Sequence, residues 1–167
     1  MNPLLEPVAP MAHTPGAFSP EVLAHIRQVT EELVPFNRFL GLQLRDIGPE
    51  HIRYRLHARP ELRGHLTIPR IHGGAISAAL DAVAVAALMA AICAKFADEP
   101  LPQLLQRVAR LSTIDLRVDF LRPGLGEVFE ASAQVRRMGS RVASVGMAFQ
   151  DAEGALLATG TAAYMVS

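Results

Sequence analysis

Asp81 is a carboxylate inside the most apolar stretch of the sequence. The segment from Ala75 to Ala94 contains only one other polar residue, Ser77. An ionised carboxylate left unpaired in an apolar environment is strongly destabilising, so some group must pair or solvate Asp81. A carboxylate held in this way can act as a nucleophile or as the general base for a water molecule. Asp81 is therefore a candidate catalytic residue, and the alternative is an aspartate that only accepts hydrogen bonds at a subunit seam.

His72, Gly73 and Gly74 stand directly before this segment, at the predicted start of a long helix. Backbone N–H groups at a helix N-terminus lack intrahelical partners, and the helix dipole is positive there. Glycines let a ligand approach these groups closely, and such an N–H can stabilise the oxyanion that develops from an ester or thioester carbonyl. His-Gly-Gly alone is a weak motif. With an aspartate nine residues after the histidine in an apolar helix, it becomes a fairly specific one.

The remaining elements follow from hydrophobic periodicity. Spacing of three and four predicts a helix, and alternation of apolar and polar residues predicts strands. The sequence predicts a short helix over Glu21–Val34, a hairpin of Leu42–Ile47 and His51–Arg59, a loop over Pro60–Ile71, the long helix from Gly73 to about Phe96, a loop containing Pro100 and Pro102, and strands over Ile114–Phe120, Phe129–Arg136, Val142–Gln150 and Leu156–Val166.

The composition of the long helix indicates how the sheet packs on it. Eleven of the 23 residues from Ala75 to Ala97 are alanine, which lets a sheet approach the helix closely on several sides. We therefore expect an α+β fold in which an antiparallel sheet wraps around one central helix. An open sheet leaves an edge and an apolar face, so we expect at least a dimer.

Composition excludes several classes of protein. The 16 basic residues balance 16 acidic ones, which argues against general binding to nucleic acid or to an anionic membrane. Cys93 is the only cysteine, so an internal disulfide and a multi-cysteine zinc site are excluded, and a cytoplasmic location is expected. No spacing suggests any other metal site. The longest apolar run, Ala82–Ala94, is 13 residues, below the roughly 18 that cross a bilayer. Five prolines within the first 20 residues predict a flexible tail over residues 1–19 before a single domain over residues 20–167.

The segment from His72 to Asp81 resembles the HGG…D signature of hot-dog-fold acyl-CoA thioesterases of the phenylacetyl-CoA thioesterase (PaaI-type) branch. The similarity continues through Thr113–Pro123 and Gly139–Val166, and Pro35–Gly41 resembles the opening of the YigI-like members. The resemblance implies a hot-dog fold and an enzyme that hydrolyses acyl-CoA to a free acid and CoA. It implies no cofactor beyond the CoA of the substrate, and a homodimer or homotetramer whose active sites are shared across the dimer interface.

The resemblance also implies roles for single residues. Gly73 N–H would polarise the thioester carbonyl, His72 would help shape that helix end, and Gly74 would contribute to substrate binding. Asp81 would attack or activate water, and Thr113 of the partner chain would orient the water. Coenzyme A would lie along the turn formed by Arg137, Gly139, Ser140, Arg141 and Val142, close to Phe120 and Tyr164.

Two positions depart from the family pattern. Members commonly carry an asparagine shortly before the HGG, where this chain has His65, with Pro69 in place of an intervening glycine. A neutral imidazole can donate one hydrogen bond in place of the amide, so His65 is a candidate for substrate binding, and a surface loop residue is the alternative.

Two other functions remain open at this stage. The same fold can bind acyl-CoA without catalysis, although no DNA-binding helix pair accompanies it here. A hydratase or dehydratase acting on acyl thioesters would need His72 or His65 paired with Asp81 as acid and base. The acyl group itself is not encoded in a recognisable motif, but the Ala/Leu/Met-rich helix slightly favours a medium or long aliphatic chain over an aryl group.

Overall fold

The computed structural model describes residues 18–167. Its elements in chain order are α1 (Pro20–Gln28), η1 (Val29–Leu33), α2 (Pro35–Leu40), β1 (Gln43–Ile47), β2 (His51–His57), η2 (Pro60–Leu62), α3 (Gly73–Lys95), α4 (Leu101–Val108), β3 (Ser112–Phe120), β4 (Val128–Met138), β5 (Val142–Asp151) and β6 (Leu156–Met165). Of the predicted tail, residues 1–17 lie outside the described residues. Ser19 caps α1, since its hydroxyl accepts the N–H of Val22 at 3.3 Å.

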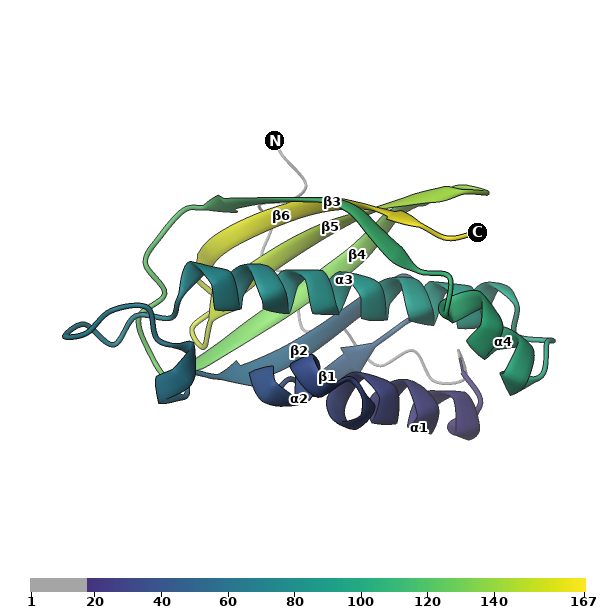
Figure 1. Cartoon of the computed structure of the whole chain (residues 1–167), viewed down its shortest axis with the longest axis horizontal. Helices are drawn as coiled ribbons and strands as arrows, with labels where there is room; N and C mark the ends of the chain where they lie inside the picture. Colours follow the sequence, from purple (N-terminus) through teal and green to yellow (C-terminus); the bar gives the residue numbers. More distant parts are fainter. Residues whose placement is uncertain (1–17) are drawn as a thin grey trace.

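The six strands form one antiparallel sheet in the order β1-β2-β4-β5-β6-β3. Figure 1 shows this sheet curving around α3, with α1 and α2 near the β1–β2 end and β3 at the opposite edge. This is the sheet wrapped around one helix that the sequence predicts, and it is the hot-dog arrangement that the family resemblance implies. The strand order leaves β1 and β3 as the two edges, each with one unpaired side.

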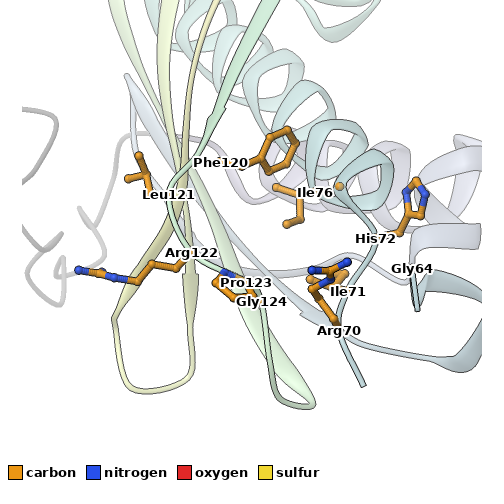
Figure 2. Close-up of a pocket in the computed structure, with 11 residues that line it drawn as sticks. Gly64, Arg70, Ile71, His72, Ile76, Phe120, Leu121, Arg122, Pro123 and Gly124 are labelled. Carbon is orange, nitrogen blue, oxygen red and sulfur yellow. The ribbon is translucent and has the colours of Figure 1, made fainter. Parts of the chain in front are cut away.

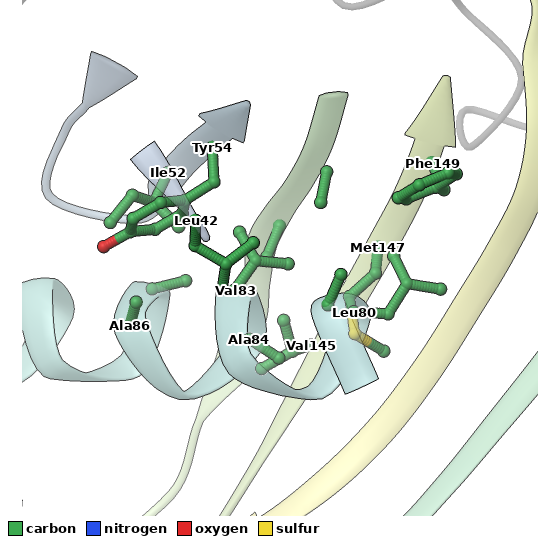
Figure 3. Packing of buried hydrophobic residues seen from close by; sticks show 14 of the residues in the cluster. Leu42, Ile52, Tyr54, Leu80, Val83, Ala84, Ala86, Val145, Met147 and Phe149 are labelled. Atoms are coloured by element: carbon green, nitrogen blue, oxygen red, sulfur yellow. The ribbon is translucent and has the colours of Figure 1, made fainter. Parts of the chain in front are cut away.

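The core lies between α3 and the concave face of the sheet. Alanine and small aliphatic residues of α3 meet larger residues of the strands, so the sheet comes close to the helix axis (Figure 3). The labelled residues of this cluster are Leu80, Val83, Ala84 and Ala86 from α3, and Leu42, Ile52, Tyr54, Val145, Met147 and Phe149 around them.

α3 is the one described helix that is long and apolar enough to cross a bilayer by length and composition. In the folded chain 67 % of its most apolar window is buried inside the domain. The helix therefore serves as the core around which the sheet closes.

Two helices were not predicted from the sequence. Pro35–Leu40 forms α2, and Leu101–Val108 forms α4 where a loop was expected because of Pro100 and Pro102. Proline lacks an N–H and fixes φ near the helical value, so it is compatible with the first turn of a helix. The prolines therefore begin these helices, and the expectation of a loop was wrong.

The predicted helix over Glu21–Val34 is present, but its second half is a π-helical turn. The hydroxyl of Thr30 donates to the carbonyl of Ile26 at 2.8 Å and accepts from the phenol of Tyr54. Glu31 accepts the N–H of Leu44. These contacts tie the N-terminal helices to β1 and β2.

Candidate active site

The N-terminus of α3 is organised by His72. Its Nδ1 accepts the N–H of Gly74 at 2.8 Å, and its carbonyl accepts the N–H groups of Ala75 and Ile76 at 2.9 and 3.1 Å. The N–H of Gly73 has no acceptor among residues 18–167. It is therefore the free donor at the positive end of the helix dipole.

The loop before α3 holds His72 in place through the backbone. The N–H of His72 donates to the carbonyl of Leu62 at 2.8 Å, and the N–H of Ile71 donates to the carbonyl of Gly124 at 3.0 Å. Gly64 lies so close that a Cβ there would stand 2.9 Å from the Cα of His72. A larger residue at position 64 would displace the start of the helix.

A cavity of about 430 Å³ opens at this end of α3. Phe120, at the end of β3, covers Gly73: a Cβ on the glycine would come within 3.3 Å of the Phe120 ring. Figure 2 shows Phe120 beside Ile76, with Arg70 and Arg122 on the same cavity. Neither arginine has an acidic partner within the described chain. We call His72, Gly73, Gly74 and Phe120 the glycine end of the site.

Asp81 lies further along α3, half-buried, and is held from two strands. Its Oδ1 accepts the phenol O–H of Tyr164 on β6 at 2.8 Å and the hydroxyl of Thr113 on β3 at 3.2 Å. No residue from 18 to 167 donates to its Oδ2. The apolar helix thus carries a carboxylate with one anchored oxygen and one open oxygen. We call Asp81, Thr113 and Tyr164 the carboxylate end.

Tyr164 has a different place from the one predicted. Its side chain is fully buried and bonds to Asp81, so it does not line the surface on which coenzyme A was expected to lie. Burial, and then the negative charge of Asp81, raises the pKa of the Tyr164 phenol well above its usual range. The phenol remains a protonated donor.

Thr113 reaches Asp81 because of a β-bulge. Thr113 pairs with Tyr164 and Asp115 pairs with Ala163, so Ile114 is the extra residue. Simple alternation with Ile114 inward would turn Thr113 outward; the bulge turns it toward α3. The family resemblance implies that Thr113 of a partner chain serves the site; in this structure Thr113 and Asp81 of one chain are bonded to each other.

The two ends of the site are separated along α3. Eight residues from Gly73 to Asp81 correspond to about 12 Å of helix. A hydrogen bond to a carbonyl oxygen, the C=O bond and an attack distance together span only roughly 7 Å. Along the axis of α3, the backbone positions of Gly73 and Asp81 are therefore further apart than one reacting carbonyl group spans.

A second cavity, of about 380 Å³, lies at the turn between β4 and β5. This turn depends on Gly139, whose N–H donates to the carbonyl of Val142 at 3.0 Å and where a Cβ would come within 2.5 Å of that oxygen. Ala143 of the same cavity pairs with Tyr164, so the cavity neighbours the carboxylate end. All five residues predicted for coenzyme A at this turn line the cavity: Arg137, Gly139, Ser140, Arg141 and Val142.

His65 lies in the exposed loop before α3. Its Nδ1 accepts the N–H groups of Thr67 and Ile68 at 3.2 and 3.1 Å, so the ring caps a turn. Neither His65 nor His72 is bonded to Asp81 within the chain. The histidine–carboxylate pair required of a hydratase is therefore not formed within one chain.

Comparison with known proteins places this geometry in a family. Residues 69–158 match the family model described as "Thioesterase superfamily". This chain belongs to the thioesterase superfamily. The medium/long-chain acyl-CoA thioesterase YigI of Escherichia coli (strain K12) is 36 % identical over 133 residues, which cover 80 % of this chain and 86 % of that protein.

Solved structures agree with this membership. A Shewanella oneidensis protein related to the thioesterase superfamily superposes with a TM-score of 0.82 at 35 % identity, covering 88 % of this chain and 96 % of that one. Thioesterase superfamily member 2 from Mus musculus superposes with a TM-score of 0.68 at 20 % identity, covering 86 % and 96 %. The second similarity shows the fold alone.

Sequence reasoning did not assign two parts of this thioesterase-superfamily site. Arg70 and Arg122 line the cavity at the glycine end. Arg70 lies two residues before the HGG, which was an available signal, whereas Arg122 is distant from it in the sequence. The hydrogen bond from Tyr164 to Asp81 had no signal, because it joins α3 to the last strand. Among residues 18–167 no group of three or more His, Cys, Asp or Glu side chains is arranged to hold a metal ion.

Proposed function

We propose that this protein is an acyl-CoA thioesterase that hydrolyses medium- or long-chain acyl-CoA to the free carboxylic acid and CoA. The observation that carries the proposal is Asp81, which is anchored through Oδ1 while Oδ2 stays open. The free N–H of Gly73 supplies the matching electrophilic group. The YigI relative supports the substrate class.

The chemistry requires one nucleophile and one oxyanion donor. Oδ2 of Asp81 either attacks the thioester carbon or takes a proton from the water that attacks it. Negative charge then develops on the carbonyl oxygen, where the Gly73 N–H and the helix dipole stabilise it. Collapse of the tetrahedral intermediate breaks the C–S bond and releases CoA as the thiolate. If Asp81 is the general base, the proton that it took from water passes to the thiolate, and the free acid is formed in the same step. If Asp81 is the nucleophile, the acyl group remains on it as a mixed anhydride, and a water molecule then hydrolyses this anhydride to the free acid, restores the carboxylate and supplies the proton for the thiolate.

The separation of the two ends implies that each active site combines two subunits. The glycine end of one subunit would hold the carbonyl while Asp81 of the partner subunit attacks it. β3 is suited to this contact because it is an edge strand with Ile114 and Phe120 about half exposed, at 52 % and 54 %. Asp81 also lies on a face of α3 that one chain covers only in part. The active unit is therefore a homodimer, and further association to a homotetramer fits the family resemblance.

The phosphates of CoA are assigned to Arg137 and Arg141. Both are exposed, line the cavity at the β4–β5 turn and have no acidic partner within the described part of the chain. Charge-assisted hydrogen bonds from guanidinium groups suit phosphate oxygens. The reaction needs no cofactor or metal, and a cytoplasmic location is consistent with a lone buried cysteine, Cys93.

The test is hydrolysis of a panel of acyl-CoAs of increasing chain length, measured by the release of the CoA thiol. Wild type and Asp81→Asn are compared, because the amide keeps the shape of the side chain and removes its charge. We expect turnover to be greatest for medium or long chains and to fall by at least about a hundredfold in Asp81→Asn. Equal turnover by the two proteins would refute the proposal.

A further inference from the structure

The phenol of Tyr164 meets Asp81 at the centre of the carboxylate end. β6 places Tyr164 directly opposite Thr113 on β3 and Ala143 on β5. Its O–H donates to Oδ1 of Asp81 at 2.8 Å, the shorter of the two hydrogen bonds to that oxygen. Both donors therefore act on one oxygen and leave the other unoccupied by any described residue.

We propose that Tyr164 is a positioning residue for the thioesterase reaction, which holds Oδ1 of Asp81 so that Oδ2 faces the thioester. This inference rests on the proposed function. Tyr164 does not itself touch the substrate, because its side chain is fully buried behind Asp81.

An aspartate on a helix can rotate about its side-chain torsions, and attack on a carbonyl carbon requires a narrow range of geometry. Thr113 alone is an incomplete anchor, because it is exposed and its hydrogen bond is the longer one, at 3.2 Å. The phenol is buried on a sheet strand, so its position is fixed by the core. It is the rigid member of the pair.

Asp81 and Asp115 are the acidic groups whose charges act on this phenol. Together with burial they keep it in the neutral, donating form. Because the Tyr164 phenol stays protonated, Asp81 keeps this hydrogen bond. Tyr164 thereby orients Asp81 without competing with it for the proton of the attacking water.

The chain offers a matched control, because it has only two tyrosines. Tyr54 is also buried, and its phenol also donates to one side chain, the hydroxyl of Thr30. Tyr54→Phe and Tyr164→Phe therefore remove the same group from the same kind of environment. Only one of them removes a contact to Asp81.

The experiment measures kcat, KM and melting temperature for wild type, both phenylalanine variants, Asp81→Asn and the double variant Asp81→Asn/Tyr164→Phe. We expect Tyr164→Phe to lower kcat by about tenfold or more with KM within about twofold. Tyr54→Phe should keep the wild-type kcat while lowering the melting temperature. In the Asp81→Asn background, loss of the Tyr164 hydroxyl should lower the residual rate no further.

Wild-type kcat in Tyr164→Phe, or an equal loss of kcat in both phenylalanine variants, would overturn the inference. An inactive wild type would instead refute the proposed function, so the two failures are distinguishable.

A spectroscopic measurement covers the case in which Tyr164→Phe does not fold. Since the chain has no tryptophan, Tyr164 is the only tyrosine signal left in a Tyr54→Phe protein. Replacing Asp81 with Asn in that protein should shift the near-ultraviolet tyrosine spectrum, because the phenol loses a charged acceptor. An unchanged spectrum would show that the phenol does not bond to Asp81.

Discussion

Two inactive variants should restore activity to one another if each active site combines two chains. The first variant is Asp81→Asn, which removes the charge at the carboxylate end. The second is Gly73→Pro, which removes the free N–H while placing proline at the first helical position, where it is tolerated. In a mixed dimer one site joins the intact Gly73 of one chain to the intact Asp81 of the other, and the second site carries both defects.

The size of the recovery follows from counting sites. When the two variants are co-expressed in equal amounts, half of the dimers are mixed and half of the sites in each mixed dimer are intact, so about a quarter of wild-type activity is expected. The prediction depends on the rise of about 12 Å along α3 from Gly73 to Asp81, which exceeds the span of one reacting carbonyl group. The assay is release of CoA thiol, normalised to total protein.

A second pair of variants serves as the control. Asp81 and Thr113 belong to the same end of the same chain, so Asp81→Asn mixed with Thr113→Val leaves no site with an intact carboxylate end. If the mixture of Asp81→Asn and Gly73→Pro is no more active than either variant alone, the two-chain site is refuted. Equal recovery in both mixtures would refute the assignment of Thr113 to the same end as Asp81.

Three further predictions follow from the geometry. Gly73→Ala keeps the N–H and only places a Cβ against the exposed ring of Phe120. In steady-state kinetics it should therefore retain much of the wild-type kcat, whereas Gly73→Pro should lower kcat by about a hundredfold. Replacing Arg137 and Arg141 together with alanine should raise the KM for acyl-CoA far more than it lowers kcat, and an unchanged KM would remove them from the site. Burial raises the pKa values of the Tyr54 and Tyr164 phenols, so their contribution to the free energy of unfolding is complete below about pH 10. Above that pH, each phenol should lose about 1.4 kcal/mol of this contribution per pH unit. Denaturant unfolding measured across this pH range, together with tyrosinate absorbance, should show that the phenols ionise only when the protein unfolds.

The long helix and the strands could be predicted because their periodicity comes from burial on one or more faces. Alternation in β2, β4 and β5 reports one buried face, and the alanine content of α3 reports burial on several sides. The resemblance then supplied the hot-dog arrangement, which the sheet order confirms. The helices that begin at Pro35 and Leu101 were not predicted, because they are short and the prolines in their first turns were interpreted as part of loops.

The site was less predictable than the fold. Asp81 stands out in the sequence because a carboxylate in an apolar helix demands a partner, but periodicity does not say which residue that partner is. Tyr164 is 83 residues away in the sequence and has the pattern of an ordinary inward strand residue. Simple alternation with Leu116 and Val118 would turn Thr113 outward, and only the extra residue Ile114 reverses it. A β-bulge determines which way such a side chain faces, and the alternation of apolar and polar residues does not show where a bulge occurs.

The order of elements along the chain has a consequence for biosynthesis. α3 emerges from the ribosome when only β1 and β2 of its sheet have been made, and all of β3 to β6 follow it. A nascent chain of this protein therefore exposes a 23-residue helix segment, whose most apolar 18-residue window has a mean hydropathy of 2.2, until translation is nearly complete. We expect the growing polypeptide to depend on ribosome-associated chaperones, and truncations after α3 to aggregate.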